Sequence, residues 1–235
     1  LKKLMGEVRL PSNDPNEHDR ASNDAVYENP AILNEYAWLW LNRDGSPTTL
    51  TDNVYQLLFS EAKTPEQRFT IYSQTLAALT EYWRAHKKVA GIQHFAGLTY
   101  SRPEEPRGQT SDMFKDLESL EFQDPFVKYV KPAFSEVAIM VNTWEKEYTA
   151  GQTLKLPIFV INDSQLPWKG DLVIEVFNDE MTLSSWTIST AVEHNKVQIE
   201  NTEIELPKIA GNYQLKVSLI YNNNTVTSYR YLNVQ

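Results

Sequence analysis

The second half of the chain carries the feature that most constrains its fold, a regular series of short β-rich runs. Turn-forming residues such as Asn162-Asp163-Ser164 separate these runs at regular intervals. About seven short strands in about 100 residues are typical of an immunoglobulin-like β-sandwich. We therefore predict an all-β sandwich domain over residues 136–235, with strands at 137–144, 153–162, 171–178, 184–190, 197–206, 213–221 and 225–234.

Residues 1–135 show a different pattern, in which two short apolar runs flank a long amphipathic segment. Ala31-Ile32-Leu33 is followed by polar residues, and a run this short suits a buried strand of a parallel sheet. Residues 89–95 predict a second buried strand. A strand, a helix and a strand in this order form a β/α unit, with the helix as the crossover.

The segment between the two runs has a clear helix start. Thr64-Pro65-Glu66-Gln67 combines an N-cap threonine, a proline at the first helical position and a glutamine that completes a capping box. An apolar stripe at helical spacing follows and predicts a helix of roughly 22 residues. The stripe consists of Phe69, Tyr72, Leu76, Leu79 and Trp83. A further short helix is expected around residues 125–134.

This β/α unit is too small to stand alone as a barrel. A parallel barrel needs eight strands, and a unit with two buried strands cannot cover both of its edges. We therefore expect residues 1–135 to dock onto sequence that is not in this chain. The chain also opens at Leu1 without an initiator Met or an apolar signal segment, which favours a processed product or a beginning that lies elsewhere.

The charge balance narrows the classes of partner. The chain has 22 Lys and Arg against 31 Asp and Glu, a net charge of -9. Nucleic-acid binding needs a basic face, so no nucleic-acid partner is expected, whereas a neutral carbohydrate fits. There is no cysteine, which excludes a cysteine nucleophile and disulfides. Because no run reaches about 18 apolar residues, we expect a soluble protein without a membrane partner.

The stretch around Glu35 resembles a known family. Glu28-Asn29-Pro30-Ala31-Ile32-Leu33-Asn34-Glu35-Tyr36-Ala37-Trp38 is similar to the seventh barrel strand of glycoside hydrolases of family 2 and the β-galactosidase type. The long helix, the strand that opens with Ala90-Gly91 and the appended sandwich follow in the family's order. The resemblance implies an α/β plus all-β chain, in which residues 1–135 form the last two strands and helices of a (β/α)8 catalytic barrel.

The same resemblance implies a retaining β-glycosidase with Glu35 as the nucleophile. We expect no cofactor and no metal. Such enzymes use two carboxyl groups about 5 Å apart. The family's acid/base follows an Asn at the end of the fourth strand, but Asn34-Glu35 is already assigned and Asn16-Glu17 lies in a polar loop. We therefore expect the acid/base on the missing N-terminal part of the same enzyme.

The candidate substrate-binding residues are Asn34, Tyr36, Trp38, Trp40 and His94. Tyr36 can donate a hydrogen bond that keeps the Glu35 carboxylate ionised. Trp38 and Trp40 alternate after Glu35, and each can stack on a sugar or pack in the core. His94 stands where the family usually has Trp. It can bind a sugar hydroxyl or be a core histidine, and this departure puts a galactosidase-like specificity in doubt.

Different classes of function therefore compete. The first is the C-terminal part of an exported glycosidase, periplasmic or extracellular, that acts on an oligo- or polysaccharide. The second is a non-catalytic module that binds carbohydrate or protein, with the β/α part as a degenerate remnant. An adhesin-like surface protein is a third option. An upstream Asn-Glu pair at the end of a predicted strand would favour the first class.

Overall fold

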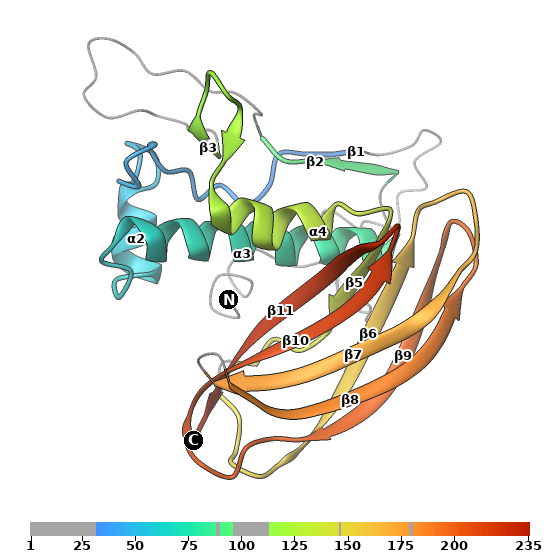
Figure 1. The fold of residues 1–235 in the computed structure, drawn as a ribbon. Coiled ribbons are helices and arrows are strands. Elements are labelled where there is room, and N and C mark those ends of the chain that lie inside the picture. The colour runs from blue at the N-terminus through green and yellow to red at the C-terminus, as the bar shows by residue number, and fades with distance from the viewer. Residues whose placement is uncertain (1–31, 88–89, 96–112, 146, 179–180) are drawn as a thin grey trace, which may run out of the picture.

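The strands of the second half pack as two antiparallel sheets, face to face (Figure 1). A computed structural model describes residues 32–87, 90–95, 113–145, 147–178 and 181–235. One sheet has the order β5-β6-β9, with β5 (Val137–Val141), β6 (Thr153–Asn162) and β9 (Lys196–Glu205). The other has the order β11-β10-β7-β8, with β7 (Trp168–Asn178), β8 (Met181–Val192), β10 (Gly211–Tyr221) and β11 (Asn224–Val234). The predicted β-sandwich is confirmed.

Alternation along the strands builds the core of the sandwich. In β7 every second residue is fully buried, namely Leu172, Ile174 and Val176, and these pack in one cluster with Leu156 and Ile158 of β6. Side chains of successive strand residues point to opposite faces, so each strand gives one apolar row to the space between the sheets.

The first part of the described chain is mostly helix and short strands. Its strands are β1 (Ile32–Asn34), β2 (Gly91–Gln93), β3 (Phe114–Asp116) and β4 (Glu121–Phe122), and its helices are α2 (Asp52–Leu58), α3 (Pro65–His86), the π-helix η1 (Phe126–Val130) and α4 (Lys131–Ala133). The predicted long helix and the short helix near residues 125–134 are both present. β1 and β2 pair in parallel, and β3 pairs with β4 as a hairpin.

The predicted barrel segment is wrong. β1 and β2 have three residues each and form a two-stranded sheet of their own. Barrel strands are covered on both faces, but Ile32 in β1 is 60% exposed and Asn34 is also exposed. The described part of the chain is dominated by sheet and has no (β/α)8 barrel segment with its ring of helices.

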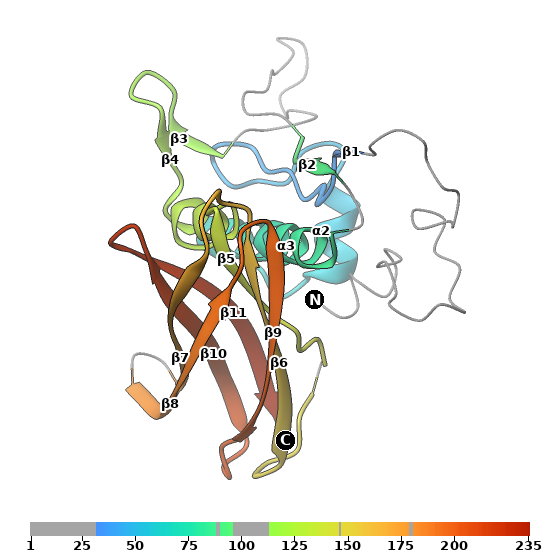
Figure 2. The same cartoon turned by 90° about the vertical axis from the view of Figure 1, so that its right-hand side faces the viewer.

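Helix α3 lies between the β1–β2 pair and the sandwich in both views (Figures 1 and 2). Tyr82, Trp83 and Ala85 of α3 share an apolar cluster with Met140 of β5 and Phe159 of β6. The outer face of the β5-β6-β9 sheet is therefore covered by the helix. Among the described residues, no helix combines the length and the apolar character that crossing a membrane requires.

Candidate functional site

The candidate site lies at the carboxyl ends of β1 and β2. Asn34 is opposite Gln93 in the parallel register, and the Glu35 backbone N–H donates to the Gln93 carbonyl at 2.9 Å. Glu35 and His94 each follow the paired residues directly, so both lie at the same edge of this small sheet. Asn34 is exposed and Glu35 is half-buried.

The backbone turns sharply at Glu35. Its φ is 77°, and Ala37 has a φ of 57°. Side-chain-bearing residues adopt the left-handed region rarely, at a cost on the order of 1–3 kcal/mol each. Packing around the turn must hold these two residues in place. Such constrained residues cluster at functional sites, so the turn favours a functional role for this segment.

Tyr36 anchors this turn to helix α3. Its hydroxyl lies 2.7 Å from the Thr80 hydroxyl, which donates its own proton to the Leu76 carbonyl at 2.8 Å. Tyr36 is therefore the donor to Thr80, and its proton is not directed at the Glu35 carboxylate as the sequence suggested. Burial raises the pKa of Tyr36 to about 12, so the phenol is neutral at ordinary pH.

The two tryptophans after Glu35 have different environments. Trp38 is 53% exposed, whereas Trp40 is buried in the core around α3. Their rings stack with centroids 5.5 Å apart and planes at 23°, and the Phe95 ring lies 5.2 Å from Trp40. Trp38 is thus an exposed aromatic ring with Trp40 stacked on one of its faces. Trp40 packs in the core, which is one of the two roles expected for these residues.

His94 is half-buried among aromatic rings. The Phe126 and Phe134 ring centroids each lie 6.2 Å away, and the imidazole Nδ1 is 3.3 Å from the Phe95 carbonyl oxygen. Burial lowers the pKa of His94, which favours the neutral ring near pH 7. A neutral ring can still exchange a hydrogen bond with a sugar hydroxyl.

A row of aromatic rings continues from His94, and it was not predicted from the sequence. Phe126 stacks on Phe122 at 4.8 Å, and Phe122 stacks on Phe114 at 4.4 Å. Phe122 and Phe134 are 39% and 41% exposed. The β3–β4 hairpin places Phe114 and Phe122. Its turn is held by Ser119, whose N–H and hydroxyl both donate to Asp116 at 2.8 Å. This Asp-to-Ser pattern is the local signal that could have located the turn.

The part of the chain that the structure describes holds no group of three or more His, Asp or Glu placed to bind a metal ion. The Asn16-Glu17 pair, which was rejected as the acid/base from its sequence context, lies outside the described residues.

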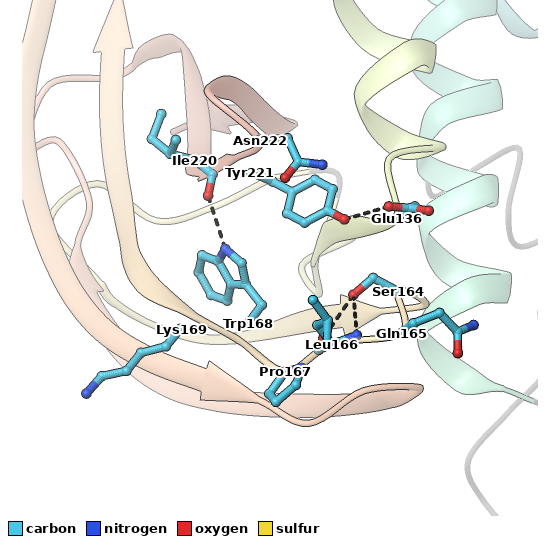
Figure 3. A pocket seen from close by; sticks show the side chains of 10 residues that line it. All are labelled: Glu136, Ser164, Gln165, Leu166, Pro167, Trp168, Lys169, Ile220, Tyr221 and Asn222. Atoms are coloured by element: carbon cyan, nitrogen blue, oxygen red, sulfur yellow. Dashed lines mark hydrogen bonds between the residues drawn. The ribbon is translucent and has the colours of Figure 1, made fainter.

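A separate cavity of about 510 Å³ lies where β7 and β10 reach one end of the sandwich (Figure 3). Tyr221 donates to the Glu136 carboxylate at 2.5 Å, and the Trp168 indole N–H donates to the Ile220 carbonyl at 3.1 Å. The Trp168 ring is 9% exposed. These polar groups thus bind each other, and the ring offers little surface to a ligand.

Comparison with known proteins leaves the family open. No family model matches the chain. No curated protein matches it either. Solved structures of weak similarity include glycosidases and a β-sandwich domain, and none of them indicates family 2 in particular.

One of them is a Paenibacillus sp. cycloisomaltooligosaccharide glucanotransferase, with a TM-score of 0.36 and 12% identity over 40% of this chain and 13% of that one. A Listeria innocua β-glucosidase has a TM-score of 0.33 and 11% identity over 43% and 16%. A CARDB domain from Pyrococcus furiosus has a TM-score of 0.32 and 13% identity over 42% and 94%. Likeness at this level carries no functional argument, and the chain spans less than a fifth of either enzyme.

Proposed function

We propose that this chain is part of a retaining β-glycosidase in which Glu35 is the nucleophile. The observation that carries the proposal is the position of Glu35, a carboxylate at the end of a strand, on a left-handed turn, three residues before the exposed Trp38 ring. Aromatic rings bind the C–H faces of sugars, and a carboxylate on a constrained backbone turn, close in sequence to such a ring, suits attack on an anomeric carbon.

The reaction assigned to Glu35 has two steps. Its carboxylate attacks the anomeric carbon and the glycosidic oxygen leaves with a proton from a general acid; water then hydrolyses the glycosyl-enzyme ester. We place the general acid, about 5 Å from the nucleophile, on sequence outside these 235 residues. Trp38 stacks on the sugar, Asn34 and His94 bind its hydroxyls, and Tyr36 fixes the turn through Thr80.

The decisive experiment is covalent trapping in the full-length protein. A 2-deoxy-2-fluoro-β-glycosyl fluoride carries a leaving group that needs no protonation, so it reports the nucleophile without involving the general acid. We expect peptide mapping to find the sugar on Glu35. Because removal of a nucleophile removes a whole chemical step, Glu35→Gln should lower the kcat on aryl β-glycosides by at least about a thousandfold.

Glu118→Gln, in the exposed turn of the β3–β4 hairpin, is the matched control and should keep full activity. A label on another residue, or normal turnover by Glu35→Gln, would remove Glu35 from the mechanism.

The second candidate is a non-catalytic module that binds carbohydrate or protein. It is favoured by the exposed rings of Trp38, Phe122 and Phe134, which form a binding surface without any need for a second carboxyl group. The two candidates differ in one measurement: a module binds its ligand without forming the covalent adduct on Glu35.

A further inference from the structure

A second cleft lies between helix α3 and the sandwich. It has a volume of about 670 Å³ and is bounded by the first turns of α3, the segment after β5, the start of β10 and the end of β11. In both ribbon views the sandwich and the β1–β2 pair lie on opposite sides of α3, so this cleft is separate from the Glu35 edge (Figures 1 and 2). Small-molecule sites are commonly clefts of about 300–1,000 Å³ between packed units.

The lining of the cleft combines aromatic rings with side-chain amides. Its residues include Trp144, Tyr231, Gln74, Asn212 and Asn233. Tyr231 is 48% exposed, and its hydroxyl accepts a hydrogen bond from the Gln74 amide at 2.6 Å, which fixes the ring. The Arg230 guanidinium lies over the Trp144 ring, 4.3 Å from its centroid, so Tyr231 rather than Trp144 offers an apolar face to a ligand. Such a ring beside amides that both donate and accept matches a ligand with C–H faces and hydroxyl groups.

Two buried polar atoms on this lining lack a hydrogen-bond partner among the described residues. They are Thr75 Oγ1, on a side chain with no exposure, and Arg230 Nε, on a side chain that is 6% exposed. A buried polar atom without a partner costs free energy, so each such atom calls for an explanation. Both residues line the cleft, so a ligand hydroxyl that enters it can, after a shift of the groups that cover these two atoms, accept from Arg230 Nε and exchange a hydrogen bond with Thr75 Oγ1.

The charges around the cleft argue against an anionic ligand. The Arg230 guanidinium is already neutralised by Glu81, with Nη2 and Oε2 2.8 Å apart. The remaining charged side chains on the lining, Glu61 and Glu145, are carboxylates that would repel an anion. Neither observation depends on Glu35.

We propose that this cleft is an accessory binding site for a neutral oligosaccharide, with Tyr231 as the stacking ring and Thr75 and Arg230 as hydrogen-bonding groups. The site binds one stretch of a chain-like carbohydrate without cleaving it. It is independent of the proposed glycosidase activity, because it lies across α3 from Glu35 and uses none of the same residues.

Isothermal titration calorimetry on the Glu35→Gln protein tests the proposal, since that background prevents hydrolysis. The probes are hexasaccharides of β-1,4-linked glucose, mannose and galactose and of β-1,3-linked glucose, with hexagalacturonate as an anionic comparison. We expect at least one neutral probe to bind and hexagalacturonate to bind more weakly than that probe.

The critical variants form a matched pair on α3. Thr75→Val and Ser73→Ala each remove a fully buried hydroxyl without a described partner, but only Thr75 lines the cleft. Both variants should fold at least as stably as the parent. Thr75→Val should weaken oligosaccharide binding roughly three- to tenfold, the effect of one hydrogen bond, while Ser73→Ala should not change it.

A second pair removes an aromatic ring. Tyr231→Ala should weaken binding at least about tenfold through lost stacking, whereas Tyr221→Ala, at the Figure 3 cavity, should bind like the parent. The proposal is overturned if none of the neutral probes binds, if hexagalacturonate binds best, or if Thr75→Val and Tyr231→Ala bind as well as their controls. If the Glu35 proposal failed and a neutral probe still bound in this cleft, the proposed function would be refuted and the accessory binding site would be supported.

Discussion

At the scale of single residues, Glu81 and Arg230 form a buried ion pair between α3 and β11. Glu81 of α3 is 2% exposed and Arg230 of β11 is 6% exposed, and Ser228 also donates to the carboxylate at 2.8 Å. Burial raises the pKa of Glu81, and the Arg230 guanidinium partly offsets that effect. A buried ion pair tends to fix geometry more than it adds stability.

Breaking this pair from one side should therefore cost more than removing it. We expect Glu81→Leu to lower the free energy of unfolding by about 3–5 kcal/mol, because the Arg230 charge is left buried without its partner. The double variant with Arg230→Met should recover most of that loss. Urea denaturation of the single and double variants measures both values. If the two single losses simply add, the two side chains are not coupled and this interpretation fails.

At the scale of elements, α3 contributes residues to two apolar clusters, one with the first part of the chain and one with the sandwich. Its N-terminus is closed by a reciprocal capping box, in which the Thr64 hydroxyl accepts from the Gln67 N–H at 3.3 Å and the Gln67 side chain accepts from the Thr64 N–H at 3.0 Å. The helix then buries residues along most of its 22-residue length. A loss at the cap is therefore felt by the cores on both sides.

Removing the cap should have a measurable but moderate effect. We predict that Thr64→Ala lowers the free energy of unfolding by about 1 kcal/mol, because a backbone N–H at the helix start loses its acceptor. Thr64→Ser keeps an acceptor at the same position and should cost only a few tenths. Thermal unfolding followed by circular dichroism compares the two. Equal losses would show that the Thr64 methyl group, and not the cap, is responsible.

The elements that local pattern determines were predicted well. The capping box at Thr64 located α3, and alternation located each strand of the sandwich, with 153–162 matching β6 to the residue. The barrel prediction failed because a three-residue apolar run has the same pattern whether it is buried on both faces or, like Ile32, left 60% exposed. Within the site, the predicted Tyr36 contact failed because Thr80, 44 residues away, accepts its proton.

At the scale of the whole molecule, one cluster of charges attaches the end of α3 to the sandwich. Asp163, directly after β6, pairs with Arg84 at 2.8 Å and with Lys87. Burial opposes ionisation of Asp163, but hydrogen bonds and charge from Lys87 and Arg84 outweigh it and hold the pKa below its ordinary 3.8. The ionised form is therefore favoured in the folded state.

This depressed pKa sets the direction of a pH effect. The folded protein binds the Asp163 proton less readily than the unfolded chain, so the stabilisation is complete above about pH 5 and is lost as the pH falls through 3.8 towards the folded value. We expect the stability gap between the parent and Asp163→Asn to be largest near pH 7 and to shrink below pH 4. Urea unfolding at several pH values measures it.

Glu193→Gln, an exposed acid in the β8–β9 turn, serves as the control and should leave the pH profile of stability as in the parent. A gap between parent and Asp163→Asn that stays constant with pH would mean that the ionisation of Asp163 is not involved.

The apolar cluster shared by α3 and the outer face of β5 and β6 has a consequence for how such a sequence can change during evolution. If the helix is lost, the sandwich exposes an apolar patch that includes Met140, Phe159 and Ile161. Recombination between α3 and β5 would therefore yield two aggregation-prone products. Transfer of the sandwich into another protein without α3 is therefore disfavoured, and we expect the helix and the sandwich to be inherited together.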